Sequence, residues 1–196
     1  MEPFYQIMKV LHVIGFVFMS IPLFNLIVVN ERALLGAPFN FDTDRYMENI
    51  IRRGAARCYV FQATVLTSGL LLLMLGPLGL AALWTSGILL AKMVLLFTLM
   101  GLLSYVHLSL QPAIDTLLAQ VSSPADVPEN FSAQLKPYRV RRKQVATVCL
   151  FLVLSTIILG LQVYGAFPFY LTLTLIALAG IFAWRVNKSL IRFGWF

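Results

Sequence analysis

Five long apolar stretches constrain the fold of this chain more than any other feature of its sequence. A helix needs about 20 mostly apolar residues to cross roughly 30 Å of hydrocarbon, and every stretch is close to that length or longer. Only 12% of the residues are charged, whereas a soluble domain has about 25%. A soluble fold would therefore leave too much apolar side chain uncovered. The stretches that we identify as membrane spans are 7–29, 58–76, 84–108, 145–164 and 168–186. The sequence thus predicts an all-α fold, a polytopic bundle of five transmembrane helices formed by a single domain, 1–196.

The basic residues are distributed unevenly over the segments between these spans. The connections 77–83 and 165–167 carry no charge. Because Lys and Arg stay on the cytoplasmic side during insertion, we expect the N-terminus outside, the C-terminus in the cytoplasm, and cytoplasmic loops at 30–57 and 109–144. The charges that carry this prediction are thirteen of the fifteen Lys and Arg residues: Arg32, Arg45, Arg52, Arg53, Arg57, Lys136, Arg139, Arg141, Arg142, Lys143, Arg185, Lys188 and Arg192.

The same charges bear on location and partners. The formal net charge is +7, but the basic residues flank membrane spans, so we exclude nucleic acid as a partner. They suit the negative surface of a cytoplasmic leaflet, and we expect an integral protein of the bacterial inner membrane, surrounded by lipid bilayer. Asn30-Glu31-Arg32 follows the first span where a signal peptide would have a small-residue cleavage site, so we expect that span to be retained.

The two long inner connections contain helix signals of their own. Thr43 or Asp44 is a typical N-cap for a helix that runs into the second span. The third span can continue through 113–121, with Pro112 marking a kink or a break. We therefore expect helix beyond the apolar stretches on the cytoplasmic side.

The two cysteines, Cys58 and Cys149, each lie near the start of an apolar stretch. They form no CxxC motif, and their spacing predicts neither a disulfide nor a zinc site. A cysteine within a span usually serves as a small apolar residue.

Ionisable groups inside a span are costly and usually face the protein interior or water, which makes His12 and Lys92 the main candidates for function. His12 lies about a turn and a half into the first span, and Lys9 lies one turn earlier on the same face. The imidazole suits an axial haem ligand or a proton-handling group. The alternative is an interfacial histidine that is hydrogen-bonded to a neighbouring helix.

Lys92 lies about eight residues into the third span, where a lysine costs about 2.5–3.5 kcal/mol. No Asp or Glu lies inside any predicted span, so its partner would be a carbonyl, water or the anion of a ligand, such as a haem or porphyrin propionate. The alternative is a side chain that extends to the outer interface.

The depths of these residues decide which of them can act together. Spans one and three both run inward, and at 1.5 Å per residue His12 and Lys92 differ in depth by only about 5 Å. We expect them to share one pocket in the outer leaflet. His107 lies roughly 25 Å deeper than His12 by the same rise, which excludes a haem bound by both histidines. His107 would serve a second, inner site or, as we favour, lie at the interface.

Two of these positions belong to a wider resemblance. The segment Lys9-Val10-Leu11-His12-Val13-Ile14 resembles the opening of the membrane-embedded protoporphyrinogen IX oxidases of the HemJ type, and Ala91-Lys92 with the leucine-rich run after it resembles the same family. Copper-resistance D proteins are similar in style. The resemblance covers about 5–110. It implies that His12 is the ligand of a haem b iron, with Lys9 beside it, and that Lys92 takes part in binding or catalysis. The family has four spans, so the fifth span and the inner loop 109–143 depart from it.

Three functions follow from this sequence. The first is a haem-b-binding redox protein, an oxidoreductase of the porphyrinogen oxidase type, which would pass electrons to a quinone or a respiratory membrane partner. The second is copper handling or transport through soft or borderline ligands, Met8, His12, Met19 and Met93. The third is a non-catalytic accessory subunit of a larger membrane complex, with a homo-oligomer as a further expectation. No GxGxxG, P-loop, HExxH or GxSxG motif is present, which argues against these well-known enzyme classes.

Overall fold

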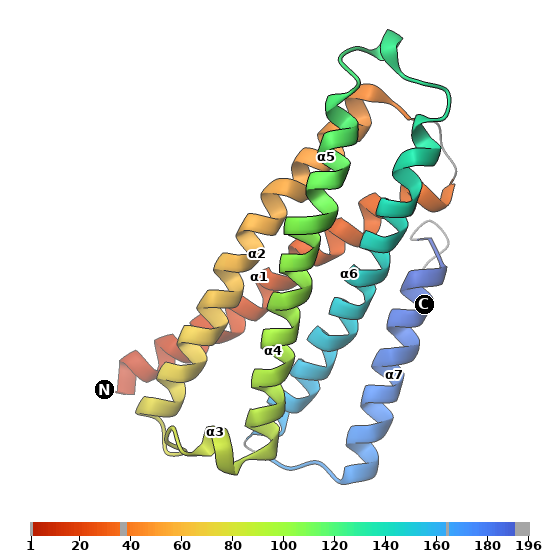
Figure 1. Ribbon diagram of the computed structural model, residues 1–196. Helices are drawn as coiled ribbons and strands as arrows, with labels where there is room; N and C mark the ends of the chain where they lie inside the picture. The colour runs from red at the N-terminus through yellow and green to blue at the C-terminus, as the bar shows by residue number, and fades with distance from the viewer. Residues whose placement is uncertain (1, 36–38, 164, 191–196) are drawn as a thin grey trace.

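The computed structural model describes residues 2–35, 39–163 and 165–190. Within these ranges the regular secondary structure is entirely helical (Figure 1). The long helices are α1 (Glu2–Leu35), α2 (Phe41–Leu75), α4 (Gly87–Tyr105), α6 (Phe131–Leu161) and α7 (Phe169–Lys188). The shorter elements are α3 (Ala82–Thr85), α5 (Gln111–Ala119), a π-helical turn at Val106–Leu110 and a 3₁₀ turn at Pro124–Asp126.

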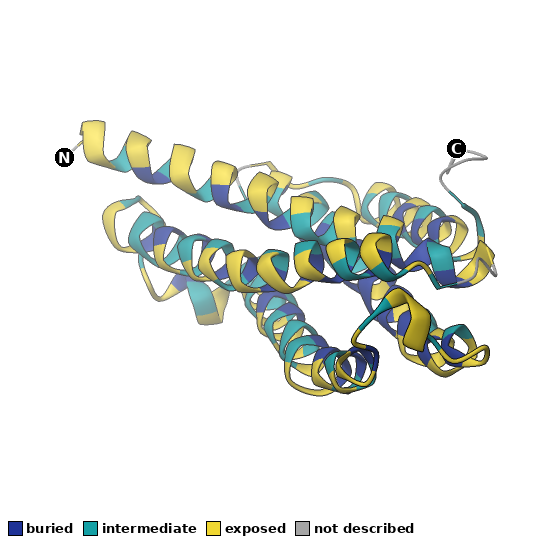
Figure 2. Cartoon of the chain, turned by 90° about the horizontal axis from the view of Figure 1, so that it is seen from above, coloured by how far each residue is buried: buried dark blue, intermediate teal, exposed yellow. Residues whose placement is uncertain are grey.

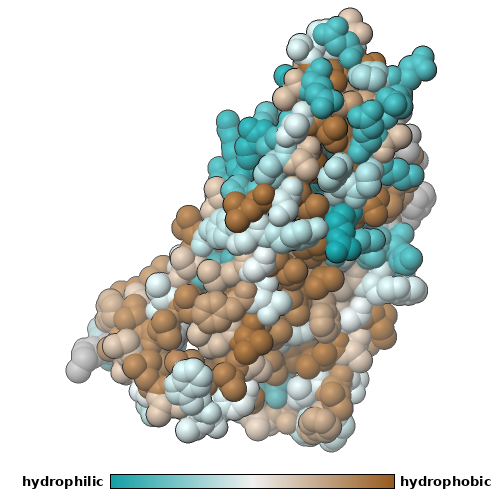
Figure 3. Space-filling view, in the orientation of Figure 1, coloured by the Kyte–Doolittle hydropathy of each residue, from teal (hydrophilic) through white to brown (hydrophobic). Residues whose placement is uncertain are grey.

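Five helical segments are long and apolar enough to cross a membrane: α1, α2, the α4–α5 segment, α6 and α7. The five predicted stretches fall on these segments, which confirms the all-α fold and the number of helices of membrane-spanning length. Four of the segments contain between 31 and 35 residues, more than the 20 or so that cross the hydrocarbon layer. Figure 3 shows that polar side chains gather over the part of the bundle opposite the N-terminus, where these helices extend farthest.

The bundle therefore has two different ends. The N-terminus and the α2–α4 and α6–α7 connections lie at one end, which we call the apolar end (Figure 1). The α1–α2 and α5–α6 connections and the C-terminal end of α7 lie toward the other, which we call the polar end. Both segments predicted as cytoplasmic loops, 30–57 and 109–144, belong to the polar end. They are mostly helical because α1, α2, α5 and α6 extend into them.

The start of α2 corrects one local prediction. The N-cap is Asn40, whose side-chain oxygen accepts a 2.9 Å hydrogen bond from the backbone N–H of Thr43. Asp44 lies inside the helix and accepts a 2.7 Å hydrogen bond from the backbone N–H of Asn40. Thr43 and Asp44 were therefore wrong as caps: the Asn40 side chain satisfies one of the first free N–H groups of the helix, that of Thr43, and Asp44 completes the reciprocal pair.

Pro112 deforms the helix that contains it without ending it. The π-helical turn Val106–Leu110 joins α4 directly to α5, and Pro112 lies in the first turn of α5. Proline has no N–H to donate to the preceding turn, and a π-helical turn is a common way to absorb such a change in the helix. The helix therefore does not break at Pro112, and the predicted extension 113–121 is helical as far as Ala119.

Helix α6 lies at the centre of the packing and contacts α1, α4 and α7, while α1 also packs along α2. In Figure 2 the buried residues face the middle of the bundle, and exposed residues cover much of its outside. Many of the exposed side chains are large and apolar, among them Val17, Phe97 and Ile181, as suits contact with lipid tails. A separate apolar core at the polar end packs Ile114, Phe131 and neighbouring residues under the α5–α6 connection.

Candidate functional site

The ring of His12 is held by helix α2. Its Nδ1 lies 3.0 Å from the carbonyl oxygen of Val65 and 3.1 Å from Oγ of Ser68. A carbonyl oxygen only accepts hydrogen bonds, so the proton is on Nδ1 and is donated to α2. The Ser68 hydroxyl donates its own proton to the carbonyl of Thr64, so its oxygen also accepts from His12. This tautomer leaves the lone pair of the imidazole on Nε2.

Glycines allow α1 to approach α2 this closely. A Cβ atom on Gly69 would lie 3.1 Å from Cε1 of His12, and one on Gly15 would lie 3.1 Å from a methyl group of Val65. Both distances are tighter than ordinary contacts between side chains. The sequence therefore fixes the position of the imidazole through small residues as well as through hydrogen bonds.

Lys92 is half-buried and crosses toward α6. A Cβ atom on Gly160 would lie 3.4 Å from its Nζ, so the amine lies beside the backbone of α6. None of the ion pairs found in the described residues includes Lys92. His12 and Lys92 thus both lie in the half of the bundle near the apolar end, His12 against α2 and Lys92 against α6.

Two other sequence candidates lie outside this pair. Nζ of Lys9 is 4.5 Å from the centre of the Tyr5 ring, in a cation–π contact on its own helix. His107 lies in the π-helical turn, where its ring packs edge-on against Tyr59 with centroids 5.9 Å apart. His12 contacts α2 at Val65, more than a turn and a half from Tyr59, so the two histidines lie at separate levels of the bundle.

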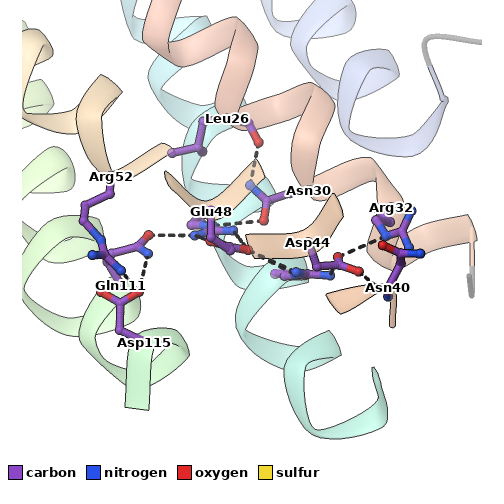
Figure 4. Close-up of polar contacts among 11 residues, drawn as sticks. Leu26, Asn30, Arg32, Asn40, Asp44, Glu48, Arg52, Gln111 and Asp115 are labelled. Carbon is purple, nitrogen blue, oxygen red and sulfur yellow. Dashed lines mark hydrogen bonds and ion pairs between the residues drawn. The ribbon is translucent and has the colours of Figure 1, made fainter. Parts of the chain in front are cut away.

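A second polar cluster, which the sequence did not predict, lies toward the polar end and is drawn in Figure 4. At its centre is Arg142 of α6, whose side chain is fully buried. It donates hydrogen bonds to Asn30 at 2.9 Å, to Gln111 at 2.7 Å and to both oxygens of Glu48 at 2.8 and 2.9 Å. Arg142 therefore joins its own helix to α1, α2 and α5.

Arg139, one turn earlier on α6, extends this cluster toward the α1–α2 connection. It pairs with Asp44 at 2.8 Å and with Glu48 at 3.1 Å, and Asp44 also pairs with Arg32 at 3.0 Å. We call the set the buried ionic network; its members are Asn30, Arg32, Asp44, Glu48, Gln111, Arg139 and Arg142. Close by, Lys143 lies 3.8 Å from Glu31 and donates to the carbonyl of Ser189, which ties the end of α7 to α6.

The buried ionic network is suited to holding helices together. A buried charge is costly unless it is paired and hydrogen-bonded, and here three nitrogens of Arg142 and both carboxylate oxygens of Glu48 are used within the protein. A guanidinium whose donors are already used offers little to a ligand. The network thus joins four helices and leaves few donors or acceptors for a ligand.

From the sequence, Arg139 and Arg142 were interpreted only as charges that orient the spans, and the acidic residues were placed outside the spans. A signal was nevertheless present. Asp44 and Glu48 are four residues apart, and Arg139 and Arg142 are three apart, so each pair shares one helix face. Opposite charges on such faces favour interhelical pairing, but the sequence does not show which helices meet.

The structure gives little support for a site that binds a metal ion through protein side chains alone. The described residues contain no cluster of three or more His, Cys, Asp or Glu side chains that could hold a metal. Of the methionines proposed as copper ligands beside His12, Met19 lies two turns farther along α1, in the apolar core with Leu99. Comparison of the chain with protein-family models, with curated proteins and with solved structures finds no match.

Proposed function

We propose that this chain is an integral membrane protein that binds haem b through His12 and acts in electron transfer, as an oxidoreductase of the porphyrinogen oxidase type. The observation that supports it is the donation from Nδ1 of His12 to the carbonyl of Val65. Histidines that bind a metal commonly donate their second ring nitrogen to a carbonyl or carboxylate, which fixes the tautomer and turns the other nitrogen toward the metal.

The ligand set favours haem over a free metal ion. A free copper or zinc ion takes several ligands from the protein, whereas haem iron needs as few as one axial side chain because the porphyrin supplies the others. His12 provides one such ligand. Lys92, which lies in the same half of the bundle as His12 and has no carboxylate partner among the ion pairs described above, would attract a propionate of the porphyrin. These two side chains would supply the axial ligand and the positive charge that the group requires.

In this proposal His12, Gly69 and Lys92 have separate roles. His12 would hold the iron, the close packing at Gly69 would keep the imidazole in place, and Lys92 would orient the macrocycle or an anionic porphyrin substrate. Bound haem supplies one-electron oxidation and reduction, so the electrons of a multi-electron oxidation would pass on to a quinone or to a membrane redox partner.

Orientation follows from the charges at the two ends. We propose that the polar end faces the cytoplasm of a bacterium and the apolar end faces outward, because the basic side chains gather at the polar end and Lys and Arg remain inside during insertion. The exposed apolar side chains of the helices support contact with lipid. In this orientation His12 and Lys92 lie in the outer half of the membrane.

The test compares absorption spectra of the purified full chain with those of His12→Ala and His107→Ala. We expect the parent protein and His107→Ala to carry the same pigment per chain, and His12→Ala to lose it. His107 is the matched control because it is the second histidine of the chain and lies at another level of the bundle. Equal pigment in His12→Ala and in the parent, or loss only in His107→Ala, would overturn the assignment.

A further inference from the structure

An apolar cavity lies inside the bundle, between α1, α2, α4 and α6, and the haem proposal does not use it. Its walls are mostly aliphatic side chains, such as Leu99, Leu103 and Val153. Along α2 the lining extends from Ile51 to Gln62, roughly 16 Å at the rise of a helix. Because α2 runs toward the apolar end of the bundle (Figure 1), Gln62 lies at that end of the lining. We call this space the Gln62 cavity.

Gln62 lines the cavity with a polar atom that the protein leaves unpaired. The residue is only 2% exposed, and its Oε1 has no hydrogen-bond partner among the described residues. Such an atom is destabilising, because it has lost its hydrogen bonds to water and gained none in the protein. An amide oxygen accepts hydrogen bonds and does not donate them. What is missing at this point is therefore a donor.

The other side chains of the lining do not supply that donor. They include no charged group and no hydroxyl. Thiols are weak donors, and Sγ of Cys58 lies 4.0 Å from the backbone carbonyl of Met19 instead. A buried water needs about two to four polar partners, and the amide is the only strong one in the lining. The surroundings suit an apolar molecule that carries its own donor.

Sulfur atoms in the lining indicate the kind of molecule. Met19 on α1, Cys58 on α2 and Cys149 on α6 all line the cavity and belong to one core cluster. Sulfur makes favourable contacts with aromatic rings, yet the lining contains no aromatic side chain. A ring supplied by a ligand would make these contacts, and a hydroxyl on that ring would supply the missing donor.

We propose that the Gln62 cavity binds an aromatic ring that carries a hydroxyl group. The hydroxyl donates to Oε1 of Gln62, and the ring lies against the sulfur-bearing side chains. The ring is uncharged, since burial of a charge without a partner in an apolar cavity is costly. Two sources offer such a ring: the head group of a reduced membrane quinone, and a free phenol dissolved in the bilayer.

The Gln62 cavity is separate from the proposed haem site. Met19 lies seven residues beyond His12, roughly 10 Å along α1, and the cavity lining does not include His12. Loss of haem and loss of phenol recognition are therefore expected in different variants, so one proposal can fail while the other holds.

The test compares two probes of nearly the same shape, 4-methylphenol and p-xylene, in which a methyl group replaces the hydroxyl. Equilibrium dialysis of the detergent-solubilised full chain against protein-free micelles measures the binding of each. Gln62→Leu removes the acceptor and keeps a side chain of similar size. The preference for 4-methylphenol over p-xylene should be about tenfold larger in the parent than in Gln62→Leu, which corresponds to roughly 1.4 kcal/mol. The same preference in both proteins would overturn the proposal.

Two control variants should keep the preference of the parent. Gln162→Leu removes a second buried amide, which is hydrogen-bonded to Thr172 and lies outside the cavity. His12→Ala removes the proposed haem ligand. Loss of the preference in either control to the same extent as in Gln62→Leu would show that the effect does not arise at the cavity.

The melting temperature separates recognition of a ligand from a structural role of Gln62. Without a probe, Gln62→Leu should melt at a higher temperature than the parent, because it removes a buried acceptor that has no partner. A lower melting temperature, together with an unchanged preference, would mean that the amide serves the fold, and the site would be refuted.

A measurement on the parent chain does not depend on the folding of Gln62→Leu. With carbon-13 in the methionine methyl groups, ring protons of bound 4-methylphenol should show nuclear Overhauser effects to the methyl group of Met19. Contacts only with methionines outside the lining, such as Met93, would place the probe elsewhere and contradict the proposal.

The source of the ring is identified by mass spectrometry of small molecules that copurify with the chain from membranes. A quinol that is retained by the parent and lost from Gln62→Leu would identify the membrane carrier. Binding of 4-methylphenol to a parent chain that retains no quinol would identify a free phenol.

Discussion

Arg142 on α6 donates from its two terminal nitrogens to the two oxygens of Glu48 on α2, at 2.8 and 2.9 Å. Both side chains are almost completely withdrawn from solvent. Arginine and carboxylate groups that meet in this bidentate way are among the stronger and more directional pairs in proteins. In this bundle the pair joins α6 to α2, and the remaining donors of Arg142 join the same point to α1 and α5.

The first prediction concerns the stability that this pair provides. Glu48→Gln should lower the free energy of unfolding by about 3–5 kcal/mol, because two buried guanidinium groups lose their shared carboxylate. The measurement is denaturant or thermal unfolding of the detergent-solubilised chain. Asp115→Asn is the matched control, since the Asp115 pair with Arg52 is partly exposed and such pairs contribute about 0–1 kcal/mol. Similar losses in both variants would show that the buried ionic network is not a main source of stability.

The second prediction concerns the close packing of His12. Gly69→Ala places a methyl group 3.1 Å from the His12 ring, so the ring must shift and pigment per chain should fall. Gly101→Ala is the control, because a Cβ atom there meets nothing within 4 Å. Spectra of the two purified variants, with their melting temperatures, check this. Equal pigment in both would mean that the position of the imidazole is not critical.

The third prediction separates function from stability at Lys92. Lys92→Met removes a charge from an apolar span and should stabilise the haem-free bundle, by up to the 2.5–3.5 kcal/mol or so that a lysine costs there. The same change should weaken haem retention, whereas Lys92→Arg should preserve it. Unfolding of the haem-free chain and pigment remaining after dilution measure the two effects. A Lys92→Met protein that keeps its haem as well as the parent would rule out the proposed contact with a propionate.

The fourth prediction concerns orientation. Thr85, in the short helix of the apolar end, and Ser122, in the α5–α6 connection, are both exposed, so cysteines placed there should react with a maleimide. With a reagent that does not cross membranes, intact cells should label Thr85→Cys, and Ser122→Cys should react only after permeabilisation. The parent chain is the control because Cys58 and Cys149 are buried. The reverse pattern would invert the proposed topology.

Much of the architecture was predictable because it depends on local properties of the chain. Hydropathy over a span-length window identifies each long helix, and the effect of Pro112 follows from its missing N–H. The start of α2 was predicted at Thr43 or Asp44, but the cap is Asn40. Asn, Asp and Thr are all good N-caps, so the sequence alone did not decide between neighbouring candidates.

The candidate sites were only partly predictable because they depend on contacts between helices. The similar depths of His12 and Lys92 follow from their places in the spans, but the sequence does not show that Val65 and Ser68 hold the imidazole. The charges of Arg139 and Arg142 fit the positive-inside pattern so well that their burial was missed. Cys58 and Cys149 each looked like an ordinary apolar residue, and the sequence does not show that both line one cavity of the bundle.

The most direct test of the haem assignment is the absorption spectrum of the purified full chain, first air-oxidised and then reduced with dithionite. A haem b protein should show a Soret band, sharp α and β bands on reduction, and the pyridine haemochrome of haem b at one haem per chain. A folded, purified protein without visible absorption bands in either state would contradict the haem assignment.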